Sequence, residues 1–108
     1  MTLRLVTFFL TLLIGLSPAA AFNLNIHNGE TNIALIIAIY DMNTPEQRKV
    51  FSSSIDSGGE ISVDVTSADG KGHIRWEAQT SDRKKCGSGD EADLSVGANV
   101  DIRTPDSC

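Results

Sequence analysis

Residues 31–40 read TNIALIIAIY, and this stretch decides the fold because, in a strand, its side chains divide into two apolar faces. In an extended strand, successive side chains point to opposite faces of the sheet. Odd-numbered positions 33 to 39 then place Ile, Leu, Ile and Ile on one face. The other face consists of Ala34, Ile36, Ala38 and Tyr40. A strand of a β-sandwich normally has one apolar and one polar face. We therefore expect a strand at 31–40 whose outer face is covered.

Two kinds of cover fit this pattern. The favoured interpretation is cover within the chain, by a turn at Thr44–Val50 or by a central position in a closed barrel. The alternative is a partner surface formed by Ala34, Ile36, Ala38 and Tyr40, which binds a second copy or another exported protein.

Shorter alternating segments surround this stretch and predict an all-β fold. Strands are expected near 22–28, 61–66, 73–79 and 99–103, with weaker candidates at Val50–Ile55 and Leu94–Val96. Turn formers separate them at 57–59, 67–72 and 81–90. Six or seven short strands at this spacing favour a small antiparallel β-sandwich, with a barrel as the alternative.

Two connections carry more specific signals. Asn28-Gly29 is typical of a tight hairpin turn. Thr44, followed by Pro45 and by Gln47, predicts one capped helical turn over Thr44–Val50, unless Arg48–Ile55 continues as a strand.

The first 21 residues have the features of a secretory signal peptide. Arg4 precedes an apolar run at Leu5–Leu16, Pro18 follows it, and Ala19-Ala20-Ala21 supplies small residues for cleavage. An apolar run of this length is shorter than the roughly 20 residues that span a bilayer. We therefore expect residues 1–21 to be removed, no membrane insertion afterwards, and one β-sandwich domain over residues 22–108 in a secreted or periplasmic protein.

The charge balance excludes some classes of partner. The chain has nine Lys and Arg against 14 Asp and Glu, a formal charge of −5, and the loss of Arg4 makes the mature chain more acidic. Nucleic acids and anionic membranes require a basic surface, so neither is an expected partner.

The two cysteines, Cys86 and Cys108, both lie in the expected mature chain. An oxidising compartment favours one disulfide between them. Closing residues 86–108 into a loop contributes roughly 3–4 kcal/mol on the chain-entropy model.

Catalysis is not expected. The only histidines are His27 and His73, and no serine lies in a G-x-S-x-G context. The sequence therefore predicts neither an enzyme nor a cofactor.

Metal binding is the weaker alternative. His27, His73 and Met42 are possible ligands of copper or zinc, and the acidic run 87–93 is a possible calcium loop. Neither pattern has the spacing of a known metal motif.

Basic residues Arg83, Lys84 and Lys85 directly precede Cys86, and acidic residues follow at positions 90, 91 and 93. A loop over 83–93 with opposite charges at its ends could form a recognition surface. Trp76 alternates with charged residues and is expected in the core with Ile74 and Ala78.

The sequence thus predicts a small exported accessory protein that acts by binding a protein partner. A periplasmic metal-binding protein and an exported inhibitor or toxin-neutralising protein remain as alternatives.

Overall fold

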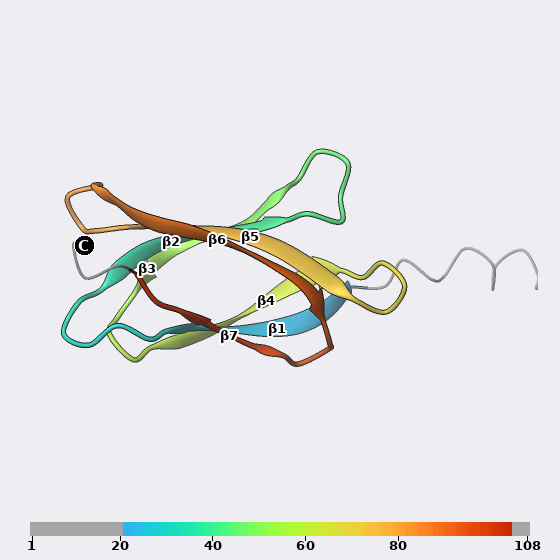
Figure 1. The fold of residues 1–108 in the computed structure, drawn as a ribbon, viewed down its shortest axis with the longest axis horizontal. Helices are drawn as coiled ribbons and strands as arrows, with labels where there is room; N and C mark the ends of the chain where they lie inside the picture. Colours follow the sequence, from blue (N-terminus) through green and yellow to red (C-terminus); the bar gives the residue numbers. More distant parts are fainter. Residues whose placement is uncertain (1–20, 105–108) are drawn as a thin grey trace, which may run out of the picture.

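The computed structural model describes residues 21–104, in which seven strands form two facing sheets (Figure 1). A three-stranded sheet has the order β4-β1-β7, and a four-stranded sheet has the order β3-β2-β5-β6. The described residues contain no helix. The prediction of an all-β sandwich of six or seven strands is confirmed, with seven strands observed. The strands are β1 (Ala21–Asn28), β2 (Leu35–Asp41), β3 (Lys49–Ile55), β4 (Glu60–Thr66), β5 (Gly72–Gln79), β6 (Lys85–Leu94) and β7 (Asn99–Ile102).

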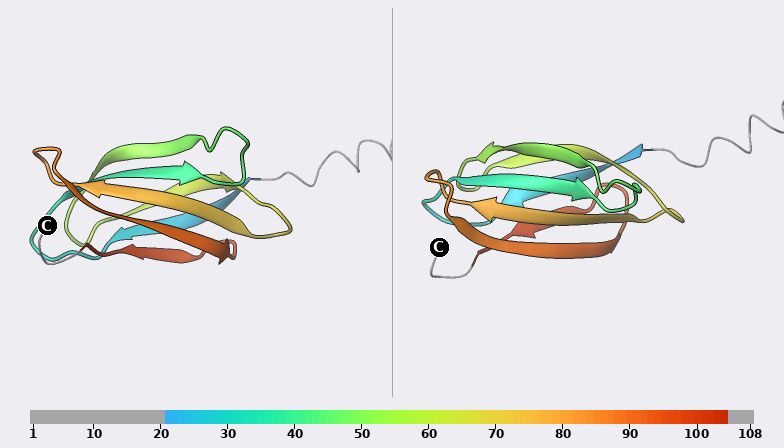
Figure 2. Two further views of the ribbon diagram at one scale, coloured as in Figure 1. Left: turned by 45° about the horizontal axis from the view of Figure 1, so that its top comes forward. Right: turned by 90° about the horizontal axis from the view of Figure 1, so that it is seen from above.

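The core lies between the two sheets, which Figure 2 shows as separate layers. Alternation along the strands supplies it, because every second residue of β2 and β5 is buried. Trp76 is 7% exposed and lies in the core beside Ile74 and Ala78, as expected. The buried apolar residues are Leu24, Ile26, Leu35, Ile37, Ile39, Ile55, Val63, Val65, Ile74, Trp76, Ala78, Val100 and Ile102.

The expectation of a hairpin at Asn28-Gly29 is wrong, because the chain changes sheet there. β1 pairs antiparallel with β4 and parallel with β7, whereas β2 belongs to the other sheet. The fully buried Asn28 side chain stabilises this crossing. Its Nδ2 donates to the carbonyl oxygens of Ile33 (3.0 Å) and Ile55 (2.9 Å), and its Oδ1 accepts from the Glu30 amide. The parallel β1–β7 pair also makes the sandwich mostly, not wholly, antiparallel.

Asp41 joins the sheets at the other end of the sandwich. This fully buried carboxylate ends β2, and its Oδ2 accepts a hydrogen bond from the Thr66 amide at the end of β4 (2.8 Å). Its Oδ1 accepts from the Asn43 amide (3.2 Å). The Asn43 side chain in turn donates to the carbonyl oxygens of Thr66 and Lys71, both at 3.0 Å. Buried polar groups need such partners, so Asp41 fixes where the two sheets meet.

The capped helical turn expected at Thr44–Val50 is not formed. Thr44 does bond its neighbours, since its Oγ1 donates to the Asp41 carbonyl and accepts from the Arg48 amide, both at 2.9 Å. These bonds close a turn between β2 and β3. The alternative interpretation, a strand over Arg48–Ile55, is confirmed as β3.

The segment 81–90 was expected to be a loop, but most of it belongs to β6. Only residues 80–84 form a turn, closed by bonds between Thr80 and Lys84 and from Arg83 to Thr80. Gly89 pairs with Trp76, and a Cβ atom at Gly89 would lie 2.5 Å from the indole Nε1. Glycine here makes room for the indole and does not mark a turn. The weak candidate at Leu94–Val96 is also wrong, because β6 ends at Leu94 and Val96 is 67% exposed.

Some expectations fall outside the described residues. Residues 1–20 hold nearly all of the expected signal peptide, and Cys108 lies within 105–108, so the signal peptide and the Cys86–Cys108 disulfide stay predictions. Among residues 21–104, no helix is long and apolar enough to cross a membrane.

Replacing Asp41 with Ala should destabilise the protein by about 3 kcal/mol, because the Thr66 amide loses the buried carboxylate that accepts its hydrogen bond. Urea unfolding measures this change. Glu46→Ala, which removes an exposed acid from the following turn, should have little effect. Equal stability of the two variants would contradict the role of Asp41.

Gly89→Ala should destabilise the protein by about 1–3 kcal/mol, because the new Cβ displaces the Trp76 indole. The displacement should also shift the fluorescence emission of this single tryptophan. Ser88→Ala, at an exposed position of the same strand, is the control. An unchanged emission spectrum in Gly89→Ala would show that the indole does not lie against β6.

Candidate binding face

The outer face of the four-stranded sheet carries a narrow apolar stripe along its central strand. Ile36, Ala38 and Tyr40 of β2 point away from the core and are half-buried. The strand register fixes their neighbours, because directly opposed residues lie on the same face. Ile36 lies between Ser54 and Gln79, Ala38 between Ser52 and Glu77, and Tyr40 between Lys49 and Arg75.

Within this stripe, the Tyr40 phenol is the group whose orientation is most firmly fixed. Its hydroxyl donates to Glu77 Oε1 (3.2 Å), and Arg75 Nη1 donates to Glu77 Oε2 (3.0 Å). The Arg75 guanidinium lies 4.4 Å from the ring centroid, and Lys49 Nζ lies 5.7 Å from it. Both distances are within the range of cation–π attraction. The ring is thus oriented by hydrogen bonding and by two cations.

Glu77 is ionised in this arrangement. Burial raises the pKa of its carboxyl, but hydrogen bonds from Arg75 and Tyr40 and the positive charges of Arg75 and Lys85 outweigh burial and hold the pKa below its ordinary value. The carboxylate therefore offsets part of the positive charge. Among the described residues, Lys49 is the cation beside Tyr40 that has no ion-pair partner.

A groove of about 180 Å³ runs over the stripe. One cation at each end, Lys49 and Arg83, frames its apolar floor. Arg83 reaches it from the β5–β6 turn, where this residue has a φ of 66°. The groove is lined by Ile36, Ala38, Tyr40, Lys49, Ser52, Glu77, Gln79 and Arg83.

The stripe is partly covered from within the chain, but not by the element that was expected. The side chains of β3 and β5 flank it, whereas the Thr44–Val50 segment forms a turn beyond the end of β2. Of the residues proposed to bind a partner, Ile36, Ala38, Tyr40 and Arg83 come together in the groove. Half-buried Ala34 precedes β2, and exposed Lys84 and Lys85 lie beside the groove without lining it.

The sequence did not identify Lys49, Ser52, Glu77 or Gln79 as groove residues. These residues belong to the alternating polar positions of β3 and β5, which the sequence does show. Only the strand register shows that they lie beside β2.

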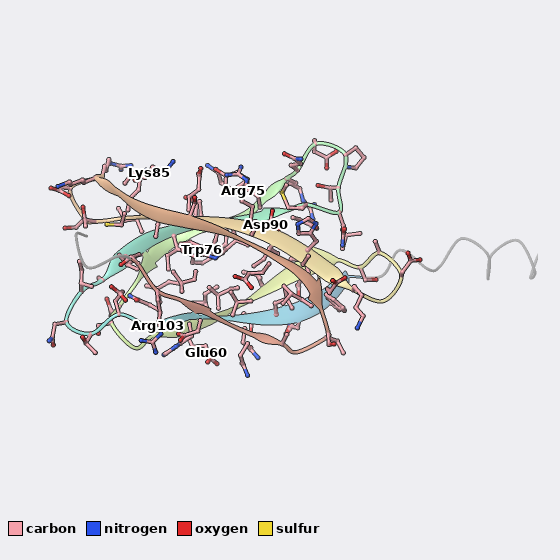
Figure 3. The ribbon with its side chains drawn as sticks, viewed as in Figure 1. Glu60, Arg75, Trp76, Lys85, Asp90 and Arg103 are labelled. Atoms are coloured by element: carbon pink, nitrogen blue, oxygen red, sulfur yellow. The ribbon has the colours of Figure 1, made fainter. Side chains whose placement is uncertain are left out.

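Most of the basic residues of this acidic molecule belong to this sheet and its connections, where they are interspersed with acids such as Glu77 and Asp90. Of the nine Lys and Arg residues, Arg4 lies outside the described part, and seven lie on or next to the four-stranded sheet. Figure 3 shows Arg75 and Lys85 projecting from this layer, Glu60 projecting from the opposite layer, and Trp76 between them. The seven are Arg48, Lys49, Lys71, Arg75, Arg83, Lys84 and Lys85.

The outer face of the three-stranded sheet is polar throughout and has a different character. His27 lies between Glu60 and Asp101 in the register, and its Nδ1 donates to Asp101 Oδ1 (2.7 Å). Asn23 donates to Asp64 in the same way (2.6 Å). This face has no apolar stripe. It presents Asn23, Asn25, His27, Glu60, Ser62, Asp64, Asn99 and Asp101.

The structure does not bring all three proposed metal ligands together. His27 is in the three-stranded sheet, whereas His73 and Met42 belong to the other layer, where the Met42 amide donates to the His73 carbonyl. Over residues 21–104, no group of three or more His, Cys, Asp or Glu side chains could hold a metal ion.

The acidic run 87–93 is not a calcium loop but part of β6, and its Asp90 accepts a hydrogen bond from His73 Nε2 (2.7 Å). The segment 83–93 was expected to be a recognition loop, and this expectation is also wrong, because most of the segment belongs to β6.

Asp101→Asn should lower stability by less than about 1 kcal/mol near neutral pH, because this half-exposed carboxylate is screened by solvent. Hydrogen bonds from His27 and then from Arg103 lower the pKa of Asp101 below its ordinary value of 3.8. The folded state therefore favours the carboxylate. Its contribution is present above the unfolded-state pKa and is lost as the pH falls through the lower, folded-state pKa.

Urea unfolding from about pH 6 to about pH 2 tests this sign, because the difference between Asp101→Asn and the unsubstituted protein should vanish in acid. Asp56→Asn, at an exposed acid without a side-chain partner among the described residues, is the control. A difference that grows in acid would contradict the assignment.

Comparison of the chain with protein-family models, with curated proteins and with solved structures gave no match.

Proposed function

We propose that this chain is an exported, non-catalytic binding protein that holds another exported protein on the outer face of its four-stranded sheet. The observation that carries the proposal is the apolar stripe of Ile36, Ala38 and Tyr40 under a groove with a cation at each end. The two cations beside an apolar stripe distinguish this face from the polar outer face of the three-stranded sheet.

The chemistry of the groove indicates the kind of partner. Tyrosine and arginine contribute much of the binding energy at protein interfaces, and a fixed ring loses little conformational entropy on binding. Lys49 and Arg83 would pair with carboxylates, while the stripe would bury an apolar side chain between them. The partner surface that fits is therefore an apolar residue flanked by acidic residues. A second copy of this chain remains the other candidate.

The proposal also includes export of the chain and a disulfide between Cys86 and Cys108. The signal-like residues 1–21 support secretion or a periplasmic location, and the described residues include no free cysteine. A bridge from Cys86 to Cys108 would restrain the unfolded chain and would anchor β6 next to the Arg83 turn.

The alternative of an exported inhibitor or toxin-neutralising protein would use the same groove and would differ in the consequence for the partner. No specific observation favours the metal-binding alternative, since its candidate ligands are divided between the two layers.

The proposal is tested by photo-crosslinking in the exporting host. A photoreactive amino acid at Ala38 should give a covalent adduct with an exported protein, and the same probe at Asn25, on the opposite outer face, should not. Adducts only from Asn25, or from neither position, would overturn the proposal.

With the crosslinked protein purified as the binding partner, Ile36→Asp should weaken binding about tenfold or more, because it places a charge on the apolar floor of the groove. Val96→Asp makes the same kind of change at an exposed apolar residue outside the groove and should leave affinity unchanged. Calorimetric titration measures both variants. Equal losses would show that the groove does not make the contact.

A further inference from the structure

The sandwich is incompletely closed on the side where β3 and β4, the edge strands of the two sheets, follow one another. Phe51 and Ser53 of β3 face inward, because they pair with the buried Ile39 and Ile37 of β2. Phe51 is nevertheless only half-buried, and Ser53 is exposed. The opposite sheet therefore covers only part of the inner face of β3.

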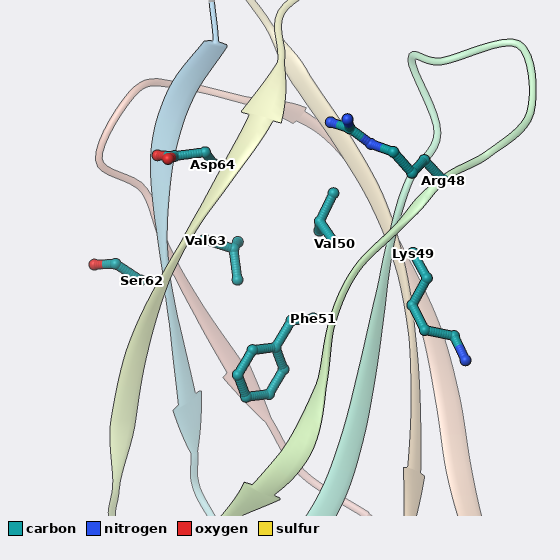
Figure 4. A pocket seen from close by; sticks show the side chains of 7 residues that line it. All are labelled: Arg48, Lys49, Val50, Phe51, Ser62, Val63 and Asp64. Atoms are coloured by element: carbon teal, nitrogen blue, oxygen red, sulfur yellow. The ribbon is translucent and has the colours of Figure 1, made fainter.

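A cleft of about 460 Å³, here called the β3–β4 cleft, lies on this side. Figure 4 shows Val50, Phe51 and Val63 projecting into it from the two strands. Val63 is buried, whereas Val50 and Phe51 are half-buried and remain accessible from the cleft. Its volume is within the range of roughly 300–1,000 Å³ that small-molecule sites occupy. The cleft therefore has an apolar interior of a size that suits a small ligand.

A β-bulge directs a cation to this cleft. The register between β2 and β3 shifts at Val50, and bulges of this kind re-aim the side chains that flank them. Arg48 consequently lies opposite the inward-facing Asp41, whose amide donates to the Arg48 carbonyl oxygen (2.8 Å). Lys49 lies opposite Tyr40 and points to the outer face. Figure 4 shows the Arg48 guanidinium reaching across the cleft toward β4, while Lys49 points away from it.

The charge of Arg48 is not neutralised within the described chain, where its side chain makes no hydrogen bond or ion pair. The nearby acids have other partners. The Asp41 carboxylate accepts hydrogen bonds from two backbone amides. Asp64, on β4, points to the outer face and accepts from the Asn23 side chain (2.6 Å). A lone guanidinium over an apolar interior is complementary to a carboxylate that carries an apolar chain, because guanidinium binds carboxylate through two parallel hydrogen bonds.

We propose that the β3–β4 cleft binds a fatty acid. Its carboxylate pairs with Arg48, and its hydrocarbon chain enters the cleft among Val50, Phe51 and Val63. Each methylene group that becomes buried there tightens binding by up to about fourfold. This site goes beyond the proposed function and does not depend on it, because the cleft lies between the edges of the two sheets and the protein-binding groove lies on an outer face.

An NMR titration of the exported, processed protein with octanoate tests the site. Octanoate should bind with a Kd of about 1 mM or below. It should shift the backbone amide resonances of residues 48–51 and 62–64 and leave those of residues 36–40 unchanged. Acetate has the carboxylate without the chain, and 1-octanol has the chain without the charge. Each should bind about tenfold or more weakly than octanoate, because the site uses both parts of the ligand.

Two neighbouring cations supply a matched pair of variants. Arg48→Gln should weaken octanoate binding about tenfold and leave 1-octanol binding unchanged, because it removes the charge and keeps the apolar interior. Lys49→Gln removes the same charge from the adjacent residue, which points to the outer face, and should leave the binding of both ligands unchanged. Val50→Ser, at a half-buried position of the cleft, should weaken both ligands. Circular dichroism and urea unfolding establish that each variant is folded.

Three results would overturn the proposal. The first is the absence of any octanoate-dependent shift up to about 10 mM. The second is a set of shifts confined to residues 36–40, which would place octanoate in the groove on the outer face. The third is equal octanoate affinity in Arg48→Gln and Lys49→Gln. The crosslinking result at Ala38 is independent of all of these, since it reports on the other face of the sheet.

Discussion

The buried carboxylate of Asp41 is the constraint on which the arrangement of the two sheets depends. Its hydrogen bond to the Thr66 amide joins the end of β2 to the end of β4, and Asn43 completes the connection by bonding both Thr66 and Lys71. Asn28 does the same at the other end, where it binds Ile33 and Ile55. Hydrophobic burial drives the sheets together but does not specify their relative position. These two polar groups supply that specificity, because any shift would leave them buried without partners.

The two sheets, held in this arrangement, have outer faces of different composition. One face is a polar array in which His27 and Asn23 are bonded to neighbouring carboxylates. The other combines an apolar stripe with the cations Lys49, Arg75 and Arg83. The difference rests on β2, the strand whose two faces are both apolar, and on its central position between β3 and β5. A strand of this composition needs cover on both sides, and the chain covers the outer side only in part.

The alternation of apolar and polar residues made the fold class predictable, and it also placed Trp76 in the core. Three features escaped prediction for physical reasons. Asn28-Gly29 has the composition of a hairpin turn, but the Asn28 side chain bonds two other segments and directs the chain into the second sheet. Gly89 resembles a loop residue, although it is a strand position kept small by the Trp76 indole. The groove could be predicted only as far as the β2 stripe, because Lys49 and Glu77 join it through a register that one sequence does not reveal.

The central claim is that the outer face of the four-stranded sheet is the binding surface. Hydrogen exchange of the chain, measured free and in complex with its exported partner, tests this claim most directly. The account predicts slower exchange in the complex over residues 36–40, 49–54 and 75–79, with no change over residues 22–28 and 60–66. Protection confined to the three-stranded sheet would contradict it.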